Sequence, residues 1–419
     1  MNAPDPSEEL TRAFRAEWPR ILATLIRFTG SVDLAEDAAQ EAFVRAFASR
    51  DRAVLINPAA WITTVAKRIA VDAVRRDAAL RERLPLLAED PPVVSLLDQP
   101  ADDDRLGLLF LACAPELSPE NRLALSLRFV CGVPTEAIAD ALLIEHTAMS
   151  ARLTRAKRQI ESRGIRFAAG DGEDRAGRLD DVLATVYVLY TTGHAAPLGS
   201  PAAGSLQDAT MTAIELARAL RRLRPDDREV AGLLALLLLT EARASTRLTG
   251  SGKLVTLEDA DRRLWDARAI QEGLDLAAEA LPGGGRFALQ AGIAGLHAEA
   301  PSWIGTDWAT IGLFYDRLLV VWPSPAAALA RIVARSYGSP GPAAALLELT
   351  ELERTLSGAV GRQALAVRAD LLRRVGRPAE SRSFYERARD VERHTPTRDF
   401  FGRRIAELDG GDPVEPGAH

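Results

Sequence analysis

The stretch that decides the fold is Gly132–Ile160, which reads GVPTEAIADALLIEHTAMSARLTRAKRQI. Its apolar residues recur at intervals of three and four, a spacing that indicates two short amphipathic helices joined by a tight turn. The residues expected inside are Ile138, Ala139 and Leu142 in the first helix, Ile144 in the turn, and Met149, Leu153 and Ile160 in the second. Because Ala139 is small, the two helices can cross closely, as a helix-turn-helix requires.

The outer face of the second helix favours DNA binding over a generic helical hairpin, although either would show this apolar spacing. A recognition helix enters the major groove with its first turns, while basic residues further along reach flanking phosphates. The candidate DNA-binding residues are His146, Thr147 and Ser150 at the start of the helix and Arg152, Arg155, Lys157 and Arg158 further along it. A plain hairpin would not need basic residues clustered on its second helix only.

Upstream of this stretch, residues 10–84 show helical periodicity with breaks at Thr29-Gly30-Ser31 and Asn57-Pro58. Ser31 or Asp33 can cap the helix that follows the first break, and proline at a first helical position is typical of a helix start. Residues 85–104 are rich in Pro and Asp, which predicts a linker. A second helical block, residues 105–168, contains an N-cap signature at Ser118-Pro119-Glu120.

The remainder of the chain, residues 178–408, is predicted to be a series of amphipathic helices. Leu179, Val182, Leu183, Val186, Leu189 and Tyr190 follow helical spacing. Leu371–His394 resembles one tetratricopeptide unit, with Gly376 at the turn and Tyr385 and Ala388 in the second helix, and Ala327–Leu352 resembles a degenerate one. The alternative is a generic helical bundle.

Composition places the chain among all-helical proteins. It has 419 residues, 47% of them apolar, and is dominated by Ala, Leu, Arg and Glu, which favour helices. The polar, acidic start lacks a secretory signal, and the apolar run Ala231–Leu239 is too short to span a membrane. Cys113 and Cys131 have no CxxC spacing and are expected to be buried reduced thiols, so we expect a cytoplasmic protein with no membrane association.

Charge alone does not identify a partner, because the net charge is −6. Basic residues nevertheless outnumber acidic ones in residues 57–83 and 146–166. Such patches occur on nucleic-acid-binding surfaces, and ordinary solvated helix faces also produce them.

Three segments together resemble the extracytoplasmic-function (ECF) sigma factors, the alternative promoter-recognition subunits of bacterial RNA polymerase in the sigma-70 family. They are Asp33–Phe47 (DLAEDAAQEAFVRAF), Asn57–Arg76 (NPAAWITTVAKRIAVDAVRR) and Leu117–Ile160. The segments Asp98–Cys113, Arg286–Leu319 and Pro323–Pro342 resemble the members that carry a C-terminal tetratricopeptide-like extension. The resemblance implies sigma region 2 at 10–84, a linker at 85–104, sigma region 4 at 105–168 and a helical regulatory domain at 178–408.

The resemblance implies a role for each segment of the first block. The helix around Asp37, Gln40 and Glu41 would dock on the β′ clamp of core RNA polymerase, and region 4 would contact the β flap and read −35 DNA. The residues implied in −10 binding are Asn57, Lys67, Arg68, Arg75 and Arg76. The loop at 50–57 would hold a flipped base, which costs a few kcal/mol to extrude. Trp61 could stack on a base, but its spacing with Val65 and Ile69 favours the core.

The C-terminal helices would modulate activity in cis, in a positive sense, or receive an unidentified signalling protein. No enzymatic activity, cofactor or metal is expected: the five histidines are scattered, and Gly250–Lys253 lacks the remaining residues of a phosphate-binding loop. Two other classes stay open. One is a one-component helix-turn-helix regulator with a helical sensor domain, which leaves Asp33–Arg76 without a role. The other is a scaffold built on the tetratricopeptide-like part.

Overall fold

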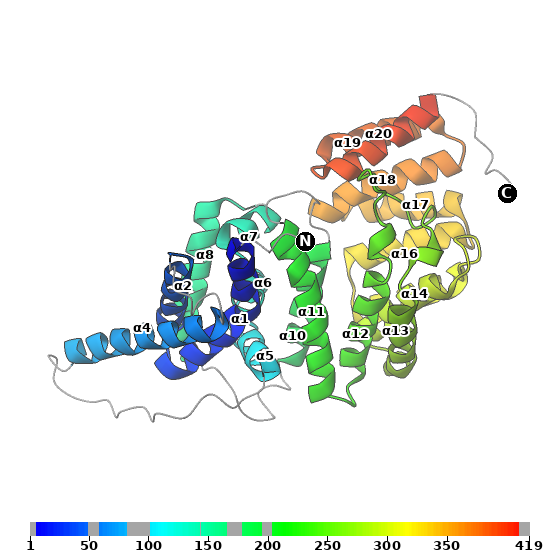
Figure 1. The fold of residues 1–419 in the computed structure, drawn as a ribbon. Coiled ribbons are helices and arrows are strands. Elements are labelled where there is room, and N and C mark those ends of the chain that lie inside the picture. Colours follow the sequence, from blue (N-terminus) through cyan, green and yellow to red (C-terminus); the bar gives the residue numbers. More distant parts are fainter. Residues whose placement is uncertain are drawn as a thin grey trace. The chain divides into compact units, whose positions relative to one another are not determined.

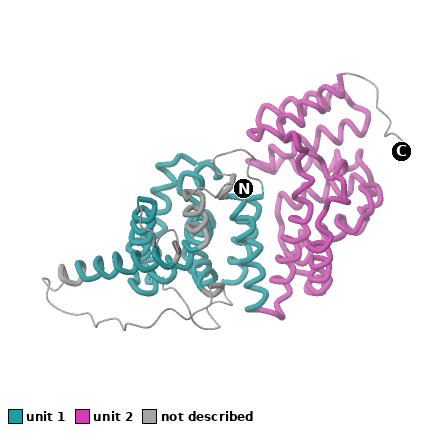
Figure 2. The backbone as a smooth tube through the Cα atoms, in the orientation of Figure 1, with its two compact units in different colours: residues 1–223 teal, residues 224–419 magenta. Residues whose placement is uncertain are grey.

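The computed structural model describes residues 6–48, 58–81, 101–142, 144–165, 178–194 and 203–409. Within these ranges the chain forms α-helices, short 3-10 turns and an isolated β-bridge between Leu248 and Leu254 (Figure 1). The all-helical class predicted from the sequence is confirmed. Contacts divide the chain into two compact units, residues 1–223 (unit 1) and residues 224–419 (unit 2), which Figure 2 shows in different colours.

Unit 1 begins with three helices, α1 (Pro6–Thr29), α2 (Val32–Ala48) and α4 (Pro58–Arg81), which pack against one another. The first break lies where the sequence predicts it, and α4 begins at Pro58, as predicted. Gly30 ends α1 with a φ of 68°, a conformation that glycine adopts at little cost. The hydroxyl of Ser31 then accepts a hydrogen bond from the backbone N–H of Leu34 at 3.3 Å, which caps α2.

Four further helices follow: α5 (Ala101–Ala112), α6 (Pro119–Phe129), α7 (Thr135–Leu142) and α8 (His146–Ser162). Ser118 caps α6 as predicted, accepting from the backbone N–H of Asn121 at 3.3 Å. Helix α5 begins within the predicted linker, because Asp104 is buried and forms an ion pair of 2.6 Å with Arg27 of α1. The rest of that linker lies outside the described residues.

Trp18 of α1 joins the two sets of helices. Its ring is fully buried, its indole N–H donates to the carbonyl oxygen of Arg128 at 3.0 Å, and the guanidinium of Arg128 lies 4.9 Å from the ring centre. Gly132, with a φ of 65°, packs against the same ring. The segments expected as sigma regions 2 and 4 therefore share a core within unit 1.

Helices α10 (Leu179–His194) and α11 (Ala203–Leu223) also belong to unit 1. The six apolar residues predicted for the inner face of α10 are all buried. Helix α10 packs on α6, where Arg122 pairs with Asp181, and α11 packs on α5, where Arg105 pairs with Glu215 at 2.5 Å. The contacts therefore place the boundary after residue 223, whereas the sequence predicts a C-terminal domain from residue 178.

Unit 2 is a succession of helices in which each packs on the next in sequence. They are α12 (Arg228–Glu241), α13 (Ala267–Ala280), α14 (Arg286–Glu299), α15 (Trp308–Val321), α16 (Pro325–Tyr337), α17 (Pro342–Glu353), α18 (Gly358–Arg374), α19 (Pro378–Val391) and α20 (Thr395–Asp409). The apolar run Ala231–Leu239 forms the buried body of α12. None of the described helices is long and apolar enough to span a membrane.

The hairpin of α18 and α19 is the part predicted to resemble a tetratricopeptide unit. Gly376 forms its turn with a φ of 76°, and Tyr385 and Ala388 are buried. Ser381 is also fully buried, and its hydroxyl donates to the carbonyl oxygen of Ala369 at 2.8 Å. This bond satisfies the hydroxyl in the interior. The assignment to that repeat class stays a prediction.

Candidate DNA and polymerase interfaces

Helices α7 and α8 form the two-helix element predicted for residues 134–160. Ile138 and Ala139 of α7 are fully buried, as are Met149 and Ala156 of α8. The turn between the helices closes with a hydrogen bond of 2.9 Å from the N–H of Ile144 to the carbonyl oxygen of Ala139. Leu142 and Ile144 are half-buried rather than internal, and Leu143 lies outside the described residues.

The outer face of α8 carries the candidate DNA-binding side chains. His146, Thr147, Ser150, Arg155 and Arg158 are exposed, and Arg152 is half-buried. Within the described residues, neither Arg155 nor Arg158 makes an ion pair. Their charges are therefore available to an anionic partner such as a phosphate backbone.

His146 is tied back to α7 at the start of this face. One ring nitrogen lies 2.9 Å from a carboxylate oxygen of Asp140. That hydrogen bond raises the pKa of His146, and the charges of Asp140, Glu136 and Glu145 act in the same direction. A raised pKa increases the fraction of imidazolium, which adds a positive charge at the first turn of α8.

Lys157 does not face solvent as the DNA-binding prediction requires. Its ammonium lies 2.5 Å from a carboxylate oxygen of Asp33 and 3.1 Å from one of Glu36, both on α2. Burial disfavours the ammonium, but the hydrogen bonds and charges of these carboxylates outweigh it and raise the pKa of Lys157. The physical reason for the difference is that burial removes part of the hydration of the Lys157 ammonium, so that pairing with the two carboxylates stabilises it.

Glu36 is the centre of this ionic cluster between α2, α6 and α8. It is 5% exposed, and one oxygen lies 2.6 Å from Nε of Arg128 while the other binds Lys157. Ser31 adds a hydrogen bond of 2.7 Å to Glu161 near the end of α8. We call Asp33, Glu36, Arg128 and Lys157 the ionic cluster below.

The predicted polymerase-binding residues lie on the exposed face of α2. Asp37, Gln40 and Glu41 are all exposed. Gln40 donates to Glu36 at 3.0 Å, and Glu41 pairs with Arg45 at 2.8 Å. Partial burial raises the pKa of Asp37, Lys157 lowers it, and Glu36 and Asp33 raise it, with a net upward shift.

The sequence analysis missed two apolar side chains beside these residues. Val44 is 62% exposed and Phe47 is 48% exposed, on a helix whose inner face is otherwise well buried. Exposed apolar residues next to polar ones are typical of protein contact surfaces. Helical spacing in the sequence could have revealed them, because Val44 and Phe47 do not lie on the helix face that carries the buried residues Ala35, Ala39 and Ala42.

Helix α4 carries the candidate −10 residues and extends beyond its neighbours in Figure 1. Lys67 is half-buried and Arg68 and Arg75 are exposed. Nε of Arg76, which is also exposed, donates to the carbonyl oxygen of Asp72 at 3.2 Å. Asn57 and the loop before it lie outside the described residues.

The buried stripe of α4 differs from the one predicted. Ile62, Ala66 and Ala70 are fully buried, whereas Trp61, Val65 and Ile69 are half-buried. The small residues face α1 and α2, which lets the backbones approach closely. Trp61 therefore lies at the edge of the core, with part of its surface accessible.

Cys113 and Cys131 are free and buried, as predicted. Burial raises the pKa of each thiol to about 12, so both remain protonated.

Three families match successive parts of the chain. Residues 13–79 match Sigma-70 region 2, residues 108–160 match Sigma-70, region 4, and residues 178–281 match a family of unknown function, DUF6596. The third match crosses the boundary between unit 1 and unit 2. No solved structure gives a significant match.

Curated relatives agree with these matches. An uncharacterized protein of Rhizobium meliloti (strain 1021) is 38% identical over 88% of this chain and 89% of its own length. The ECF RNA polymerase sigma factor SigJ of Mycobacterium tuberculosis (strain ATCC 25618 / H37Rv) is 31% identical over 35% of this chain and 48% of its own length. The ECF RNA polymerase sigma factor SigE of Mycolicibacterium smegmatis is 30% identical over 34% of this chain and 56% of its own length.

A helix-turn-helix with an unpaired basic face, packed with a helical domain that matches region 2, defines a sigma subunit of RNA polymerase. Such subunits act by binding core polymerase and promoter DNA rather than by catalysis. The chain belongs to the ECF sigma factors of the sigma-70 family and carries a C-terminal extension that includes the DUF6596 region. Membership of this family accounts for the segment Asp33–Arg76, which lies within the region 2 match. The alternative of a one-component regulator leaves that segment without a role.

Proposed function

We propose that α8 reads −35 DNA through its exposed face, that α4 holds −10 DNA and that α2 docks on the β′ clamp. Region 4 would also contact the β flap. In this proposal region 2 spans 10–84, region 4 spans 105–168, and the regulatory extension follows them, although its first two helices, α10 and α11, pack within unit 1. The C-terminal helices would modulate transcription.

The observation that carries the DNA-binding proposal is the pair Arg155 and Arg158. They are exposed on one face of α8 and have no ion-pair partner among the described residues, while Thr147 and Ser150 precede them on that face. Short polar side chains at the start of a recognition helix suit base edges, and guanidiniums one or two turns later suit phosphates.

Lys157 takes part only after the ionic cluster has opened. The −10 and −35 elements are about 25 base pairs apart by their numbering, which is about 85 Å of duplex at about 3.4 Å per base pair. Helices α2 and α8 are in direct contact through Lys157, Asp33 and Glu36. A protein in this closed arrangement cannot place α4 and α8 on both elements at once, so we propose that promoter binding separates them.

The test of the DNA-binding proposal is the double variant Arg155→Glu with Arg158→Glu. We expect it to abolish transcription from a cognate promoter, because two phosphate contacts become repulsive, while thermal unfolding stays unchanged. The matched control is Arg362→Glu with Arg398→Glu, which makes the same charge change at exposed positions of unit 2. Normal transcription by the first double variant would exclude this face as the DNA-binding surface.

The polymerase-binding proposal has a separate test. Asp37→Lys with Glu41→Lys should reduce capture of core polymerase by immobilised full-length protein, because the acidic face of α2 would repel a basic partner surface. Val44→Ser should weaken capture to a smaller degree, because it removes apolar area from the same face. Undiminished capture by both variants would show that the polymerase contact lies outside this face of α2.

The sign of the C-terminal effect can be measured directly. We expect a chain ending at residue 223 to initiate less transcription than the full chain, because we propose a positive role for unit 2. Increased transcription would instead identify unit 2 as an inhibitor, and addition of a cell extract fraction to the full chain would test for a signalling protein.

A further inference from the structure

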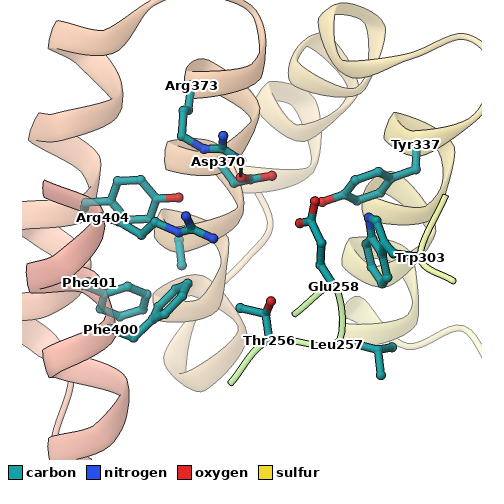
Figure 3. A pocket seen from close by; sticks show the side chains of 12 residues that line it. Thr256, Leu257, Glu258, Trp303, Tyr337, Asp370, Arg373, Phe400, Phe401 and Arg404 are labelled. Atoms are coloured by element: carbon teal, nitrogen blue, oxygen red, sulfur yellow. Dashed lines mark hydrogen bonds and ion pairs between the residues drawn. The ribbon is translucent and has the colours of Figure 1, made fainter. Parts of the chain in front are cut away.

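Unit 2 contains a solvent-open cavity of about 180 Å³ that none of the proposed contacts uses. Its walls come from the loop at 256–258, the loop around Trp303, the end of α16, and helices α18, α19 and α20 (Figure 3). Segments separated by almost 150 residues thus converge on one space. The volume is slightly larger than that of the engineered apolar cavity of about 150 Å³ that holds a benzene molecule.

Two carboxylates line the cavity, those of Glu258 and Asp370. Figure 3 shows the carboxylate of Glu258 reaching toward the hydroxyl of Tyr337, whereas Asp370 lies across the space, beside Arg373 on α18. Asp370 is neutralised by Arg373 at 2.7 Å and Arg374 at 3.7 Å. Glu258 is exposed, and in the part of the chain that the structure describes it makes no ion pair or hydrogen bond. Glu258 therefore offers a ligand in the cavity an exposed carboxylate that no cation pairs with among the described residues.

The opposite side presents hydrogen-bond donors. Arg373 and Arg404 line it, and Nε of Arg373 is buried without a hydrogen-bond partner. Arg404 pairs with Glu407 at 2.8 Å but directs its guanidinium into the space in Figure 3. Burial raises the pKa of Tyr385 to about 12, so its hydroxyl keeps its proton and can donate. A buried donor without an acceptor costs free energy unless a ligand or water satisfies it.

Aromatic rings line the cavity on both sides (Figure 3). Trp303 meets Tyr337 edge to face with ring centres 4.9 Å apart, and Phe400 meets Phe401 at 5.8 Å. Each of these four residues lines the cavity. Aromatic walls of this kind bury the apolar body of a small molecule while a few polar groups fix its orientation.

We propose that this cavity binds a small zwitterion of the α-amino-acid class. The ammonium group pairs with Glu258, the carboxylate accepts from the guanidiniums of Arg373 and Arg404, and the side chain lies against Trp303 and Phe400. A simple cation would leave the buried donor of Arg373 unsatisfied, and a simple anion would make no use of the exposed carboxylate of Glu258. The site gives unit 2 a small-molecule ligand in addition to its place in a sigma factor.

Calorimetric titration of the full-length protein with each standard L-amino acid is the test. We expect one or a few to bind. For each that binds, the corresponding amide and the N-acetyl derivative should bind at least about tenfold more weakly, because each lacks one charged hydrogen bond. Equal binding of either derivative, or no binding by any amino acid, would overturn the proposal.

Two pairs of variants place the ligand in this cavity. Glu258→Gln should weaken binding about tenfold or more, whereas Asp399→Asn, an exposed carboxylate outside the cavity, should not change it. Ala366→Leu fills the space from α18 and should abolish binding, whereas Gln363→Leu adds an apolar side chain to the exposed face of the same helix. Unfolding curves of all four variants check that the fold is kept, and unchanged binding by both cavity variants would contradict the assignment.

Discussion

At the residue scale, Glu36 shows how a single carboxylate can hold two predicted domains together. It is buried and binds Arg128 of α6 and Lys157 of α8 at the same time. Removing one partner of a buried ionic group leaves the others uncompensated, at a cost of about 3–5 kcal/mol. Its neighbour Glu41 forms only an exposed pair with Arg45 on the same helix.

Glu36→Gln should therefore lower the free energy of unfolding of unit 1 by about 3 kcal/mol. Glu41→Gln, the matched control, should change it by less than about 0.5 kcal/mol. Urea denaturation followed by circular dichroism measures both. Equal, small effects would mean that the ionic cluster contributes little to the packing of α2 on α8.

His297 predicts a pH dependence of unit 2. Burial lowers its pKa to about 4, assisted by the charges of Arg243 and Arg262, and its ring lies against Trp303 and Trp308. The folded pKa is below the unfolded value of about 6.5, so the fold prefers the neutral ring. The stabilisation is complete above about pH 6.5 and is lost as the pH falls toward 4.

We expect this effect to be about 2 kcal/mol between pH 6.5 and pH 4, after a discount for the part of the ring that meets solvent. His297→Phe keeps an aromatic ring and removes the titrating group, whose Nδ1 is buried without a hydrogen-bond partner. The difference in unfolding free energy between the two proteins should narrow or reverse at low pH. A constant difference across that range would assign the acid sensitivity to other groups.

At the element scale, the absence of a side chain at Gly232 determines how closely α12 and α14 can pack. A Cβ atom there would lie 2.5 Å from the backbone nitrogen of Ala288 and 2.8 Å from its Cα, so the two helices would have to separate. Gly402 on α20 has nothing within 4 Å of the same position. The two glycines therefore separate the effect of packing from the effect of helix propensity.

Gly232→Ala should destabilise unit 2 by about 1–3 kcal/mol through overpacking. Gly402→Ala should stabilise it by about 0.5–1 kcal/mol, because alanine favours helix and meets no obstacle. Thermal unfolding should show a lower melting temperature for Gly232→Ala and a higher one for Gly402→Ala. A stabilising effect at both positions would show that α12 and α14 are further apart.

At the scale of the whole molecule, the boundary between the units after residue 223 decides which fragment is stable. Helices α10 and α11 cover α6 and α5, and the pair of Arg122 with Asp181 and the pair of Arg105 with Glu215 lie in these contacts. A fragment of residues 1–177 loses both helices and exposes the apolar surface beneath them. A fragment of residues 1–223 keeps them.

We expect the 1–223 fragment to unfold cooperatively and the 1–177 fragment to melt several degrees lower and to aggregate, because apolar area is exposed to water. Scanning calorimetry and light scattering measure both properties. The same melting temperature for the two fragments would place the domain boundary at residue 178, as the sequence predicts.

The sequence by itself determined the helices and the chemistry of their exposed faces. The N-cap at Ser118, the helix start at Pro58 and the inner residues of α7 and α8 other than Leu142 follow from signals that act over a few residues, and so does the basic face with Arg155 and Arg158. Only the tertiary structure decided that Lys157 pairs with Asp33 and Glu36, that α10 and α11 belong to unit 1, and that a cavity forms between residues 256 and 404. The physical reason is range. Capping and helical periodicity depend on near neighbours, whereas burial and charge pairing here depend on contacts between residues that lie about 60 to 150 positions apart in the chain.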